Sequence, residues 1–273
     1  MTGTVSVVTG AAGGMGSACA RRLASRGPLV VSDRNEAALD ALAGDLRAGG
    51  CDVHTVATDV ADRGAVRDLA DTAARIGPIG AIAHTAGVSP TMDDPATIVR
   101  VDLLGTAYLL DAFLVHATAQ TAAVCIASQS AYLVPPFDAG LGALPGALLQ
   151  PDVIAKLTAA APDVIADPGI AYGWAKRQVV NLVVACAPAW GARGARVVSL
   201  SPGIIDTGMG RQELDAQPFM RTIIENTPLR RIGTADEIAS AVEFLTSDAA
   251  SFVSGVDLLV DGGSTHAVES MLR

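Results

Sequence analysis

The feature that most constrains the fold is a short apolar strand that runs straight into a glycine-rich turn and then a helix. Residues 5–9 are rich in valine, residues 10–16 read Gly-Ala-Ala-Gly-Gly-Met-Gly, and residues 17–26 are rich in alanine. Glycines at such a turn let the backbone approach a pyrophosphate, which the free amides and the dipole of the helix N-terminus attract. A glycine run alone can be a bare turn, but here a strand precedes it and a helix follows. The start of the chain therefore predicts a dinucleotide site.

An acidic residue ends the second predicted strand, at residues 29–32. Asp33 at this position can accept hydrogen bonds from the adenosine ribose hydroxyls and would repel a 2′-phosphate, which favours NAD over NADP. Two alternatives stay open. Arg34 could bind that phosphate, although no Lys or Arg lies within the glycine turn to help it. Asp33 could also be only the N-cap of the next helix.

Apolar strands and helical segments alternate along the rest of the chain. Further strands are predicted at residues 52–57, 79–84, 122–128, 196–201 and 256–260, and helices at residues 35–48, 62–76, 97–118, 172–190 and 234–246. This alternation predicts a parallel sheet with right-handed crossovers. The 273 residues, 50% of them hydrophobic, suffice for one large domain, and no linker divides them. We predict one doubly wound α/β domain of Rossmann type over residues 1–273, with a seven-stranded parallel sheet and helices on both faces.

Charge and composition exclude several classes of function. The net charge of −9 is spread without a basic cluster, which argues against a nucleic-acid partner. The four cysteines and four histidines lack the spacing of a metal site or a disulfide framework, so we predict no metal. No apolar run is long enough to span a bilayer, and the N-terminus lacks a basic segment followed by an apolar signal region. We expect a cytoplasmic protein with a small-molecule partner and no membrane partner.

Residues 171–176 carry the candidate chemistry. On a helix, Tyr172 and Lys176 lie four residues apart and leave the same face. A cation beside a phenol favours the phenolate and lowers its pKa from about 10, so that the tyrosine can exchange a proton with an alcohol or a carbonyl. The same spacing occurs on ordinary helix surfaces, so the pair needs support. Ser128 supplies it, because it ends a predicted strand, where parallel sheets bind their ligands.

Two segments lack the alternation of apolar strands with helices. Residues 131–170 are interrupted by proline and glycine, with one short predicted helix at residues 152–160, and contain apolar residues such as Phe137 and Leu141. Inserts of this length are usually lids, binding loops or interfaces. Residues 204–230 have weak periodicity with apolar points at Met209, Phe219 and Met220. That pattern is typical of a segment that covers a substrate.

Together these motifs closely resemble the short-chain dehydrogenase/reductase family over essentially the whole chain. The matching motifs, in the family's order, are Thr9-Gly10-x-x-x-Gly14-x-Gly16, Asp59-Val60, Ala86-Gly87, Ser128, Tyr172-x-x-x-Lys176, Pro202-Gly203-x-x-x-Thr207 and Asp261-Gly262-Gly263. The resemblance implies that Tyr172 is the general acid/base, that Lys176 lowers its pKa and binds the nicotinamide ribose, and that Ser128 holds the substrate oxygen. It also implies NAD as the cofactor and a homodimer or homotetramer.

The expected cofactor residues follow from the same motifs. They are Gly10, Gly14, Met15, Gly16, Asp33, Arg34, Asp59, Val60, Ala86, Gly87, Tyr172, Lys176, Pro202, Gly203, Ile205 and Thr207. Asp59 would bind the adenine amino group or only cap the next helix. Ile204 would contact the nicotinamide, and Thr207 would bind its carboxamide.

Three departures from the family pattern stand out. Asp102 occupies the place of an asparagine that holds a water next to the lysine, and an ionised carboxylate cannot donate to that water. His84 replaces an amide at the end of the fourth strand, where we expect a hydrogen-bonded structural residue. The insert before Tyr172 is longer than usual and looks like that of bacterial 3α-hydroxysteroid dehydrogenase/carbonyl reductases, as do Asp111-Ala112-Phe113-Leu114 and Ala189-Trp190-Gly191.

The leading hypothesis is an NAD-dependent oxidoreductase that transfers hydride between a secondary alcohol or ketone and nicotinamide. The apolar insert and residues 204–230 suggest a bulky hydrophobic substrate such as a hydroxysteroid. One alternative is a reductase of 3-oxoacyl thioesters. The alternative from another class is a non-catalytic NAD(H)-binding sensor or scaffold, which Asp102 alone favours.

Overall fold

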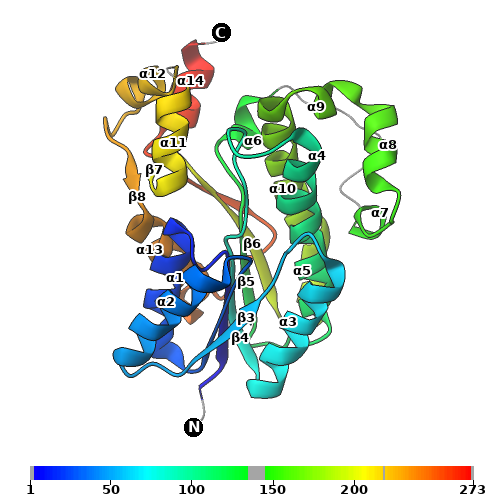
Figure 1. Cartoon of the computed structure of the whole chain (residues 1–273), viewed down its shortest axis with the longest axis vertical. Coiled ribbons are helices and arrows are strands. Elements are labelled where there is room, and N and C mark those ends of the chain that lie inside the picture. Colours follow the sequence, from blue (N-terminus) through cyan, green and yellow to red (C-terminus); the bar gives the residue numbers. More distant parts are fainter. Residues whose placement is uncertain (1–2, 135–144, 218, 272–273) are drawn as a thin grey trace.

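The computed structural model describes residues 3–134, 145–217 and 219–271. At its centre is a seven-stranded parallel sheet with the strand order β3-β2-β1-β4-β5-β6-β9 (Figure 1). The strands are β1 (Val5–Thr9), β2 (Leu29–Asp33), β3 (Val53–Ala57), β4 (Ile79–His84), β5 (Ala122–Ile126), β6 (Arg196–Pro202) and β9 (Asp257–Val260). The predicted Rossmann-type sheet is confirmed. Its strand order reverses between β1 and β4, which is where open α/β sheets bind their ligands.

Helices cover both faces of this sheet (Figure 1). One layer holds α1 (Gly14–Leu23), α2 (Glu36–Ala48) and α13 (Ala235–Leu245), and the other holds α3 (Arg63–Ile76), α5 (Gly105–Leu114) and α10 (Pro168–Gly191). The strands β1, β4 and β5 are buried along their whole length. Their near-continuous apolar sequences reflect this, because each must pack against helices on two sides.

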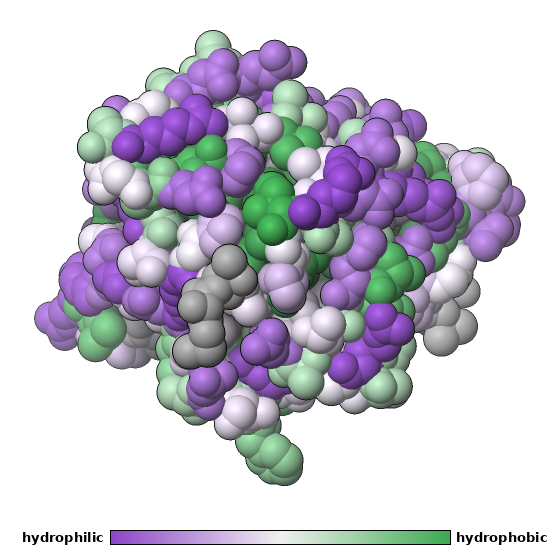
Figure 2. All heavy atoms as spheres, turned by 90° about the horizontal axis from the view of Figure 1, so that it is seen from below, coloured by the Kyte–Doolittle hydropathy of each residue, from purple (hydrophilic) through white to green (hydrophobic). Residues whose placement is uncertain are grey.

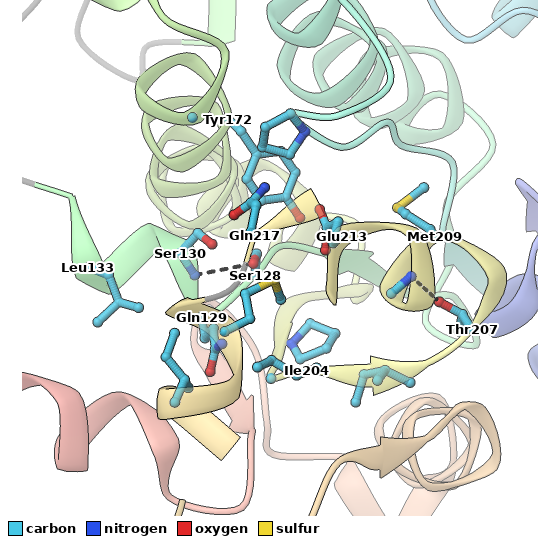
Figure 3. Close-up of a pocket in the computed structure, with 18 of the residues that line it drawn as sticks. Ser128, Gln129, Ser130, Leu133, Tyr172, Ile204, Thr207, Met209, Glu213 and Gln217 are labelled. Atoms are coloured by element: carbon cyan, nitrogen blue, oxygen red, sulfur yellow. Dashed lines mark hydrogen bonds between the residues drawn. The ribbon is translucent and has the colours of Figure 1, made fainter. Parts of the chain in front are cut away.

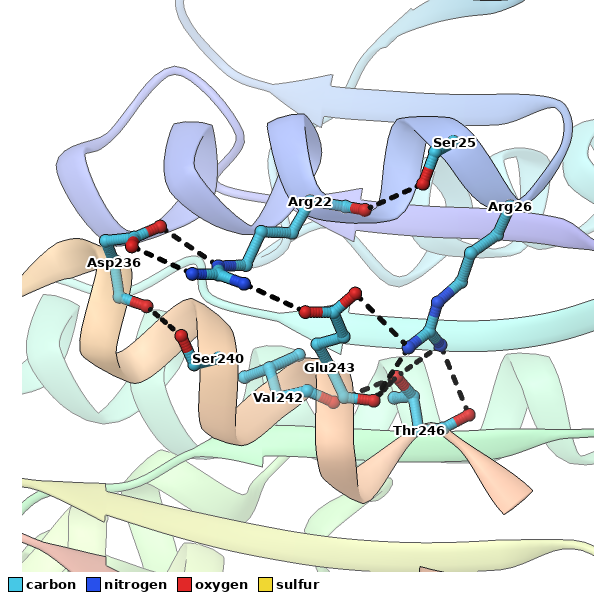
Figure 4. A network of polar contacts seen from close by, with 8 residues as sticks. All are labelled: Arg22, Ser25, Arg26, Asp236, Ser240, Val242, Glu243 and Thr246. Carbon is cyan, nitrogen blue, oxygen red and sulfur yellow. Dashed lines mark hydrogen bonds and ion pairs between the residues drawn. The ribbon is translucent and has the colours of Figure 1, made fainter. Parts of the chain in front are cut away.

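The layer of α1 and α13 is tied together by an ion-pair network (Figure 4). Arg22 donates to Asp236 at 2.8 and 2.9 Å and to Glu243 at 2.9 Å. Arg26 donates to the carbonyl oxygen of Glu243 at 2.7 Å and to the hydroxyl of Thr246 at 2.9 Å. The network therefore links α1 to α13 and holds the helices on this face of the sheet together.

Several shorter elements complete the chain. They are η1 (Ala24–Arg26), α4 (Pro95–Ile98), η2 (Val99–Leu104), α6 (Ser130–Leu133), α7 (Pro145–Leu148), α8 (Val153–Ala160), α9 (Pro162–Ala166), β7 (Ile205–Asp206), α11 (Gly208–Ala216), α12 (Phe219–Asn226), β8 (Gly233–Thr234), η3 (Asp248–Ala250) and α14 (Ser264–Met271). The helix expected at residues 97–118 is divided by the π-helical turn η2. Thr234 and Glu237 form a capping box at the start of α13. The helix expected to start at Tyr172 begins earlier, at Pro168, because Asp167 caps it and proline suits the first turn.

The described part of the long insert packs on the outside of α10 and α5. Leu148, Val153, Leu157 and Val164 are buried in the same apolar cluster as Trp174 of α10. These residues therefore belong to the core of the helical layer, whereas Phe137 and Leu141 lie outside the described residues.

The end of the molecule at the amino ends of the strands is seen in Figure 2. Hydrophilic side chains cover much of this face, with hydrophobic ones in small groups between them. Among the helices that the structure describes, none has both the length and the apolar character needed to cross a bilayer. The features of interest lie at the opposite end, at the carboxyl ends of the strands.

Candidate active site

Two cavities open at the carboxyl ends of the strands. The first, the glycine cleft, has a volume of about 520 Å³ and is lined by the glycine turn after β1 and by the ends of β2, β3 and β4. The second, the Ser128 cavity, has about 240 Å³ and lies between Ser128, Tyr172 and the helices α11 and α12. Met15, Thr207 and Met209 line both. The two cavities therefore adjoin.

The glycine turn has the shape of a pyrophosphate cradle. Gly10 has a φ of 64°, and a Cβ there would lie 2.6 Å from the Cα of Ala86. A Cβ on Gly16 would strike the carbonyl oxygen of Gly10. Helix α1 begins at Gly14 without a side-chain cap, so its first amides are left for another acceptor. The residues that line this turn fit the dinucleotide that the sequence predicts.

Asp33 ends β2 and faces the glycine cleft, together with the exposed Arg34. Its Oδ2 accepts from the amide of Ala12 at 3.0 Å, and its Oδ1 accepts from the amide of Asn35 at 3.0 Å. The N-cap of α2 is Asn35, whose side chain accepts from Ala38. The alternative that Asp33 is only a helix cap is therefore wrong, and its carboxylate is held rigidly at the edge of the cleft.

Asp59 and Val60 line the same cleft beyond the end of β3. The Oδ1 of Asp59 accepts from the amide of Ala61 at 2.9 Å. The N-cap of α3 is Asp62, which accepts from two amides of the first turn. Asp59 therefore shapes the turn before the helix, and the alternative that it caps α3 is wrong.

Ser128 and Tyr172 meet at the wall of the Ser128 cavity (Figure 3). The two side chains lie side by side, and the Oγ of Ser128 accepts from the amide of Ser130 at 3.1 Å. Burial raises the pKa of Tyr172 most, the carboxylates of Asp102 and Glu213 raise it further, and the nearby Ser128 hydroxyl opposes them. A phenol and a hydroxyl thus face the space where a substrate oxygen could lie.

Lys176 is buried and paired with Asp102. Its Nζ lies 3.5 Å from Asp102 Oδ1, donates to the carbonyl oxygen of Ile126 at 3.2 Å, and stands 5.6 Å from the centre of the Tyr172 ring. The lysine side chain is 6% exposed and the carboxylate 0%. The structure departs here from the expectation that Lys176 lowers the pKa of Tyr172. The ammonium is paired with a carboxylate that itself raises that pKa.

Asp102 lies in the π-helical turn η2, a kind of turn often found at functional sites. Its Oδ1 accepts from the amide of Val88 at 3.0 Å, and a Cβ on Gly87 would lie 2.7 Å from that oxygen. Its Oδ2 is buried and has no hydrogen-bond partner among the described residues. Burial raises the pKa of Asp102, and the Lys176 charge lowers it.

Each of the other predicted cofactor residues lines one or both of the two cavities. Ala86 and Gly87 line the glycine cleft, whereas Pro202, Gly203 and Ile205 line the Ser128 cavity. Ile204 joins the second group. Thr207 lines both, and its Oγ1 accepts from the amide of Gly210 at 3.0 Å, which caps α11.

His84 is a structural residue, as expected. Its Nδ1 lies 2.7 Å from the hydroxyl of Thr9, and its Nε2 lies 3.1 Å from that of Thr106. Burial first, and then the charge of Lys176, lower the pKa of His84 to about 3. The ring is therefore neutral and joins β4 to β1 and α5.

Sequence reasoning missed Glu213, which lines the Ser128 cavity from α11 (Figure 3). Burial raises the pKa of its carboxyl, and the nearby Ser89 hydroxyl opposes this. Gln217, one turn further along, lines the cavity too. The only signal was the spacing of Met209, Glu213 and Gln217, which are four residues apart along one helix face. Nothing in that spacing tells which face meets the cavity.

Comparisons with known proteins agree on one family. Residues 4–137 match the family model described as short chain dehydrogenase, and residues 152–265 match that described as enoyl-(acyl carrier protein) reductase. The D-threitol dehydrogenase of Mycolicibacterium smegmatis is 32% identical over 97% of this chain and 94% of its own. The cis-4-hydroxycyclohexanecarboxylate dehydrogenase of Sinomonas cyclohexanicum is 33% identical over 96% of each chain. A short-chain type dehydrogenase/reductase from Mycobacterium ulcerans has a similar structure, with a TM-score of 0.77, 25% identity and coverage of 97% and 91%.

Proposed function

The chain belongs to the short-chain dehydrogenase/reductase family of oxidoreductases that act on secondary alcohols, and we propose that it uses NAD, with Tyr172 as the general acid/base. The observation that carries this proposal is the placement of Ser128 and Tyr172 together in a cavity that adjoins the glycine cleft. The glycine turn and the amides of α1 hold the pyrophosphate. Asp33 binds the adenosine ribose, and its charge disfavours a 2′-phosphate.

The residues of the Ser128 cavity hold the substrate oxygen and move its proton. Ser128 donates a hydrogen bond to that oxygen and orients it toward Tyr172. In the oxidative direction the Oη of Tyr172 takes the hydroxyl proton, and in reduction it returns a proton to the carbonyl oxygen. Lys176 holds positive charge next to the phenol ring, 5.6 Å from its centre. When bound, nicotinamide accepts or donates the hydride.

We propose a small secondary alcohol as the substrate. The Ser128 cavity, at about 240 Å³, is smaller than the cavities of roughly 300–1,000 Å³ that hold drug-sized ligands. Most of the described apolar residues of the insert pack in or against the core, but Leu133 and Val134 line the Ser128 cavity. Phe219 and Met220 do line the cavity, so residues 204–230 cover the substrate in this proposal, and a hydroxysteroid is the second candidate. The description of the second family model names an enoyl thioester reductase, whose substrate has a carbon–carbon double bond, and so does not support a 3-oxoacyl thioester.

We further propose a cytoplasmic homodimer or homotetramer. Cys19, Cys125 and Cys186 are buried free thiols, which suits a reducing compartment. Val184 on α10 and Val115 beside α5 are exposed at 52% and 65%. Apolar side chains on neighbouring helices are the kind of surface that a second subunit covers.

Substitution of the acid/base tests the function. Tyr172→Phe removes the hydroxyl and keeps the ring, so we expect kcat for butan-2-ol oxidation to fall by about 10²- to 10⁴-fold. Fluorescence titration should show nearly unchanged affinity for NADH. The matched control is Tyr132→Phe, which removes a hydroxyl that donates to Asp257 at 2.7 Å and should leave turnover near that of the unsubstituted enzyme. Unchanged turnover in Tyr172→Phe would contradict the assignment, and NADH binding without turnover in the unsubstituted protein would favour the sensor alternative.

A further inference from the structure

Glu213 is a charged residue of the Ser128 cavity that the reaction described above does not use. We propose that its carboxyl group binds a second hydroxyl on the carbon next to the reacting one, so that the preferred substrates are vicinal diols and polyols. This inference rests on the proposed function and names the substrate class of the same site.

The position of Glu213 in the cavity is set by α11. Thr207 caps this helix through the amide of Gly210, which anchors its first turn at the junction of the two cavities. Met209, Glu213 and Gln217 then follow at intervals of four residues and all line the Ser128 cavity. One face of α11 is therefore the wall opposite Ser128 and Tyr172 (Figure 3). Of these three residues, Glu213 is the one with an ionisable side chain.

The carboxyl of Glu213 has hydrogen-bonding capacity to spare. It is within electrostatic reach of Tyr172 and Asp102, and the cation near it is Lys176, which is already paired with Asp102. The nearby hydroxyl of Ser89 lowers the pKa of this carboxyl and can occupy one of its acceptor positions. Since a carboxylate offers about four acceptor positions, others remain for a ligand.

A wholly apolar substrate would meet this carboxyl group at a cost. Covering a polar group without giving it a hydrogen bond is unfavourable. A substrate carboxylate at the same place would be repelled by the like charge. A neutral hydroxyl next to the reacting carbon avoids both penalties, because it donates to the carboxylate while Ser128 and Tyr172 hold the first oxygen.

Three probes with one carbon skeleton test the inference: butane-2,3-diol, butan-2-ol and 3-aminobutan-2-ol. We expect the unsubstituted enzyme to have a higher kcat/KM for the diol than for the mono-alcohol. In Glu213→Leu the ratio of the two values should fall by about 10- to 100-fold, the range for a hydrogen bond to a charged group. Both substrates are measured on one preparation, so the ratio does not depend on how much of the variant is folded.

Asp215→Leu is the matched control, because it removes an exposed carboxylate from the same helix. It should leave the ratio at the value of the unsubstituted enzyme. If the ratio of the two kcat/KM values is unchanged in Glu213→Leu, or if Asp215→Leu changes it equally, the role of Glu213 is overturned. Turnover of butan-2-ol in the same experiment would still uphold the proposed reaction. If 3-aminobutan-2-ol has the highest kcat/KM of the three probes, the inference is overturned too, because the group bound by Glu213 would then be an ammonium ion and not a hydroxyl. Absence of turnover with all three probes contradicts the proposed function itself.

Discussion

At the scale of single residues, the buried pair of Asp102 and Lys176 stands beside Tyr172, the residue that we propose as the acid/base. The pair joins η2 to α10 at 3.5 Å, and both side chains are almost fully buried. A buried ion pair is sensitive to the loss of either partner, because the other is left as an uncompensated charge. An asparagine at position 102 would leave the lysine charge free to act on the phenol.

The pH dependence of the reaction tests this pair. Asp102→Asn removes a carboxylate that raises the pKa of Tyr172 and leaves the Lys176 charge unpaired. Both effects favour the phenolate. Alcohol oxidation needs the deprotonated phenol, so activity appears as the pH rises through the pKa of Tyr172. We expect this limb of the kcat/KM profile to move to lower pH by about 1 unit or more. A limb that stays in place or moves upward would show that Asp102 does not act on Tyr172.

At the scale of elements, the helices that the structure describes within the insert pack against α10 and support it. Helices α7 and α9 contact α10, and α7 also contacts α5. Arg63 of α3 adds a hydrogen bond to the carbonyl oxygen of Leu149 at 3.3 Å. Because Tyr172 and Lys176 both stand on α10, this packing supports the helix that holds the proposed acid/base from outside the pocket.

Truncation of a buried insert residue tests this support. Leu157 is 1% exposed and belongs to the core cluster, so Leu157→Ala should lower the free energy of unfolding by about 2–4 kcal/mol. Thr158→Ala, its exposed neighbour on α8, should have a much smaller effect. Urea unfolding followed by circular dichroism measures both. Equal and small effects would mean that the insert is a loosely attached lid.

At the scale of the whole molecule, the fold brings distant segments to one edge of the sheet. The glycine turn follows β1, Asp33 ends β2, Ser128 follows β5, and Thr207 lies beyond β6. A dinucleotide that touches all of them would bind the folded chain alone. Binding and folding are then thermodynamically linked.

Unfolding in the presence of cofactor tests that linkage. NADH at one hundred times its Kd should raise the free energy of unfolding by about 2.7 kcal/mol. We expect NADPH at the same concentration to raise it less, because the Asp33 carboxylate lines the glycine cleft and would repel a 2′-phosphate bound there. Thermal or urea unfolding at several cofactor concentrations gives both values. A larger rise with NADPH would mean that Arg34 outweighs Asp33.

The sequence by itself determined the order of strands and helices along the chain and the motifs at the strand ends. Apolar runs, glycine turns and helix caps are local patterns, and parallel strands necessarily bring their carboxyl ends together. For this reason the positions of Gly10, Asp33 and Ser128 along the chain are enough to assign them to one edge of the sheet, whereas Tyr172 stands on a helix and joins Ser128 in the folded structure.

Only the tertiary structure decided how these residues act on one another. The pairing of Asp102 with Lys176, the exposure of Glu213 to the cavity and the packing of the insert on α10 join segments far apart in the chain. The pKa of a buried group depends on its distance to other charges and on burial, which periodicity does not contain. The sequence therefore indicated the residue that we propose as the acid/base, and the structure supplied the burial and the charges that act on its pKa.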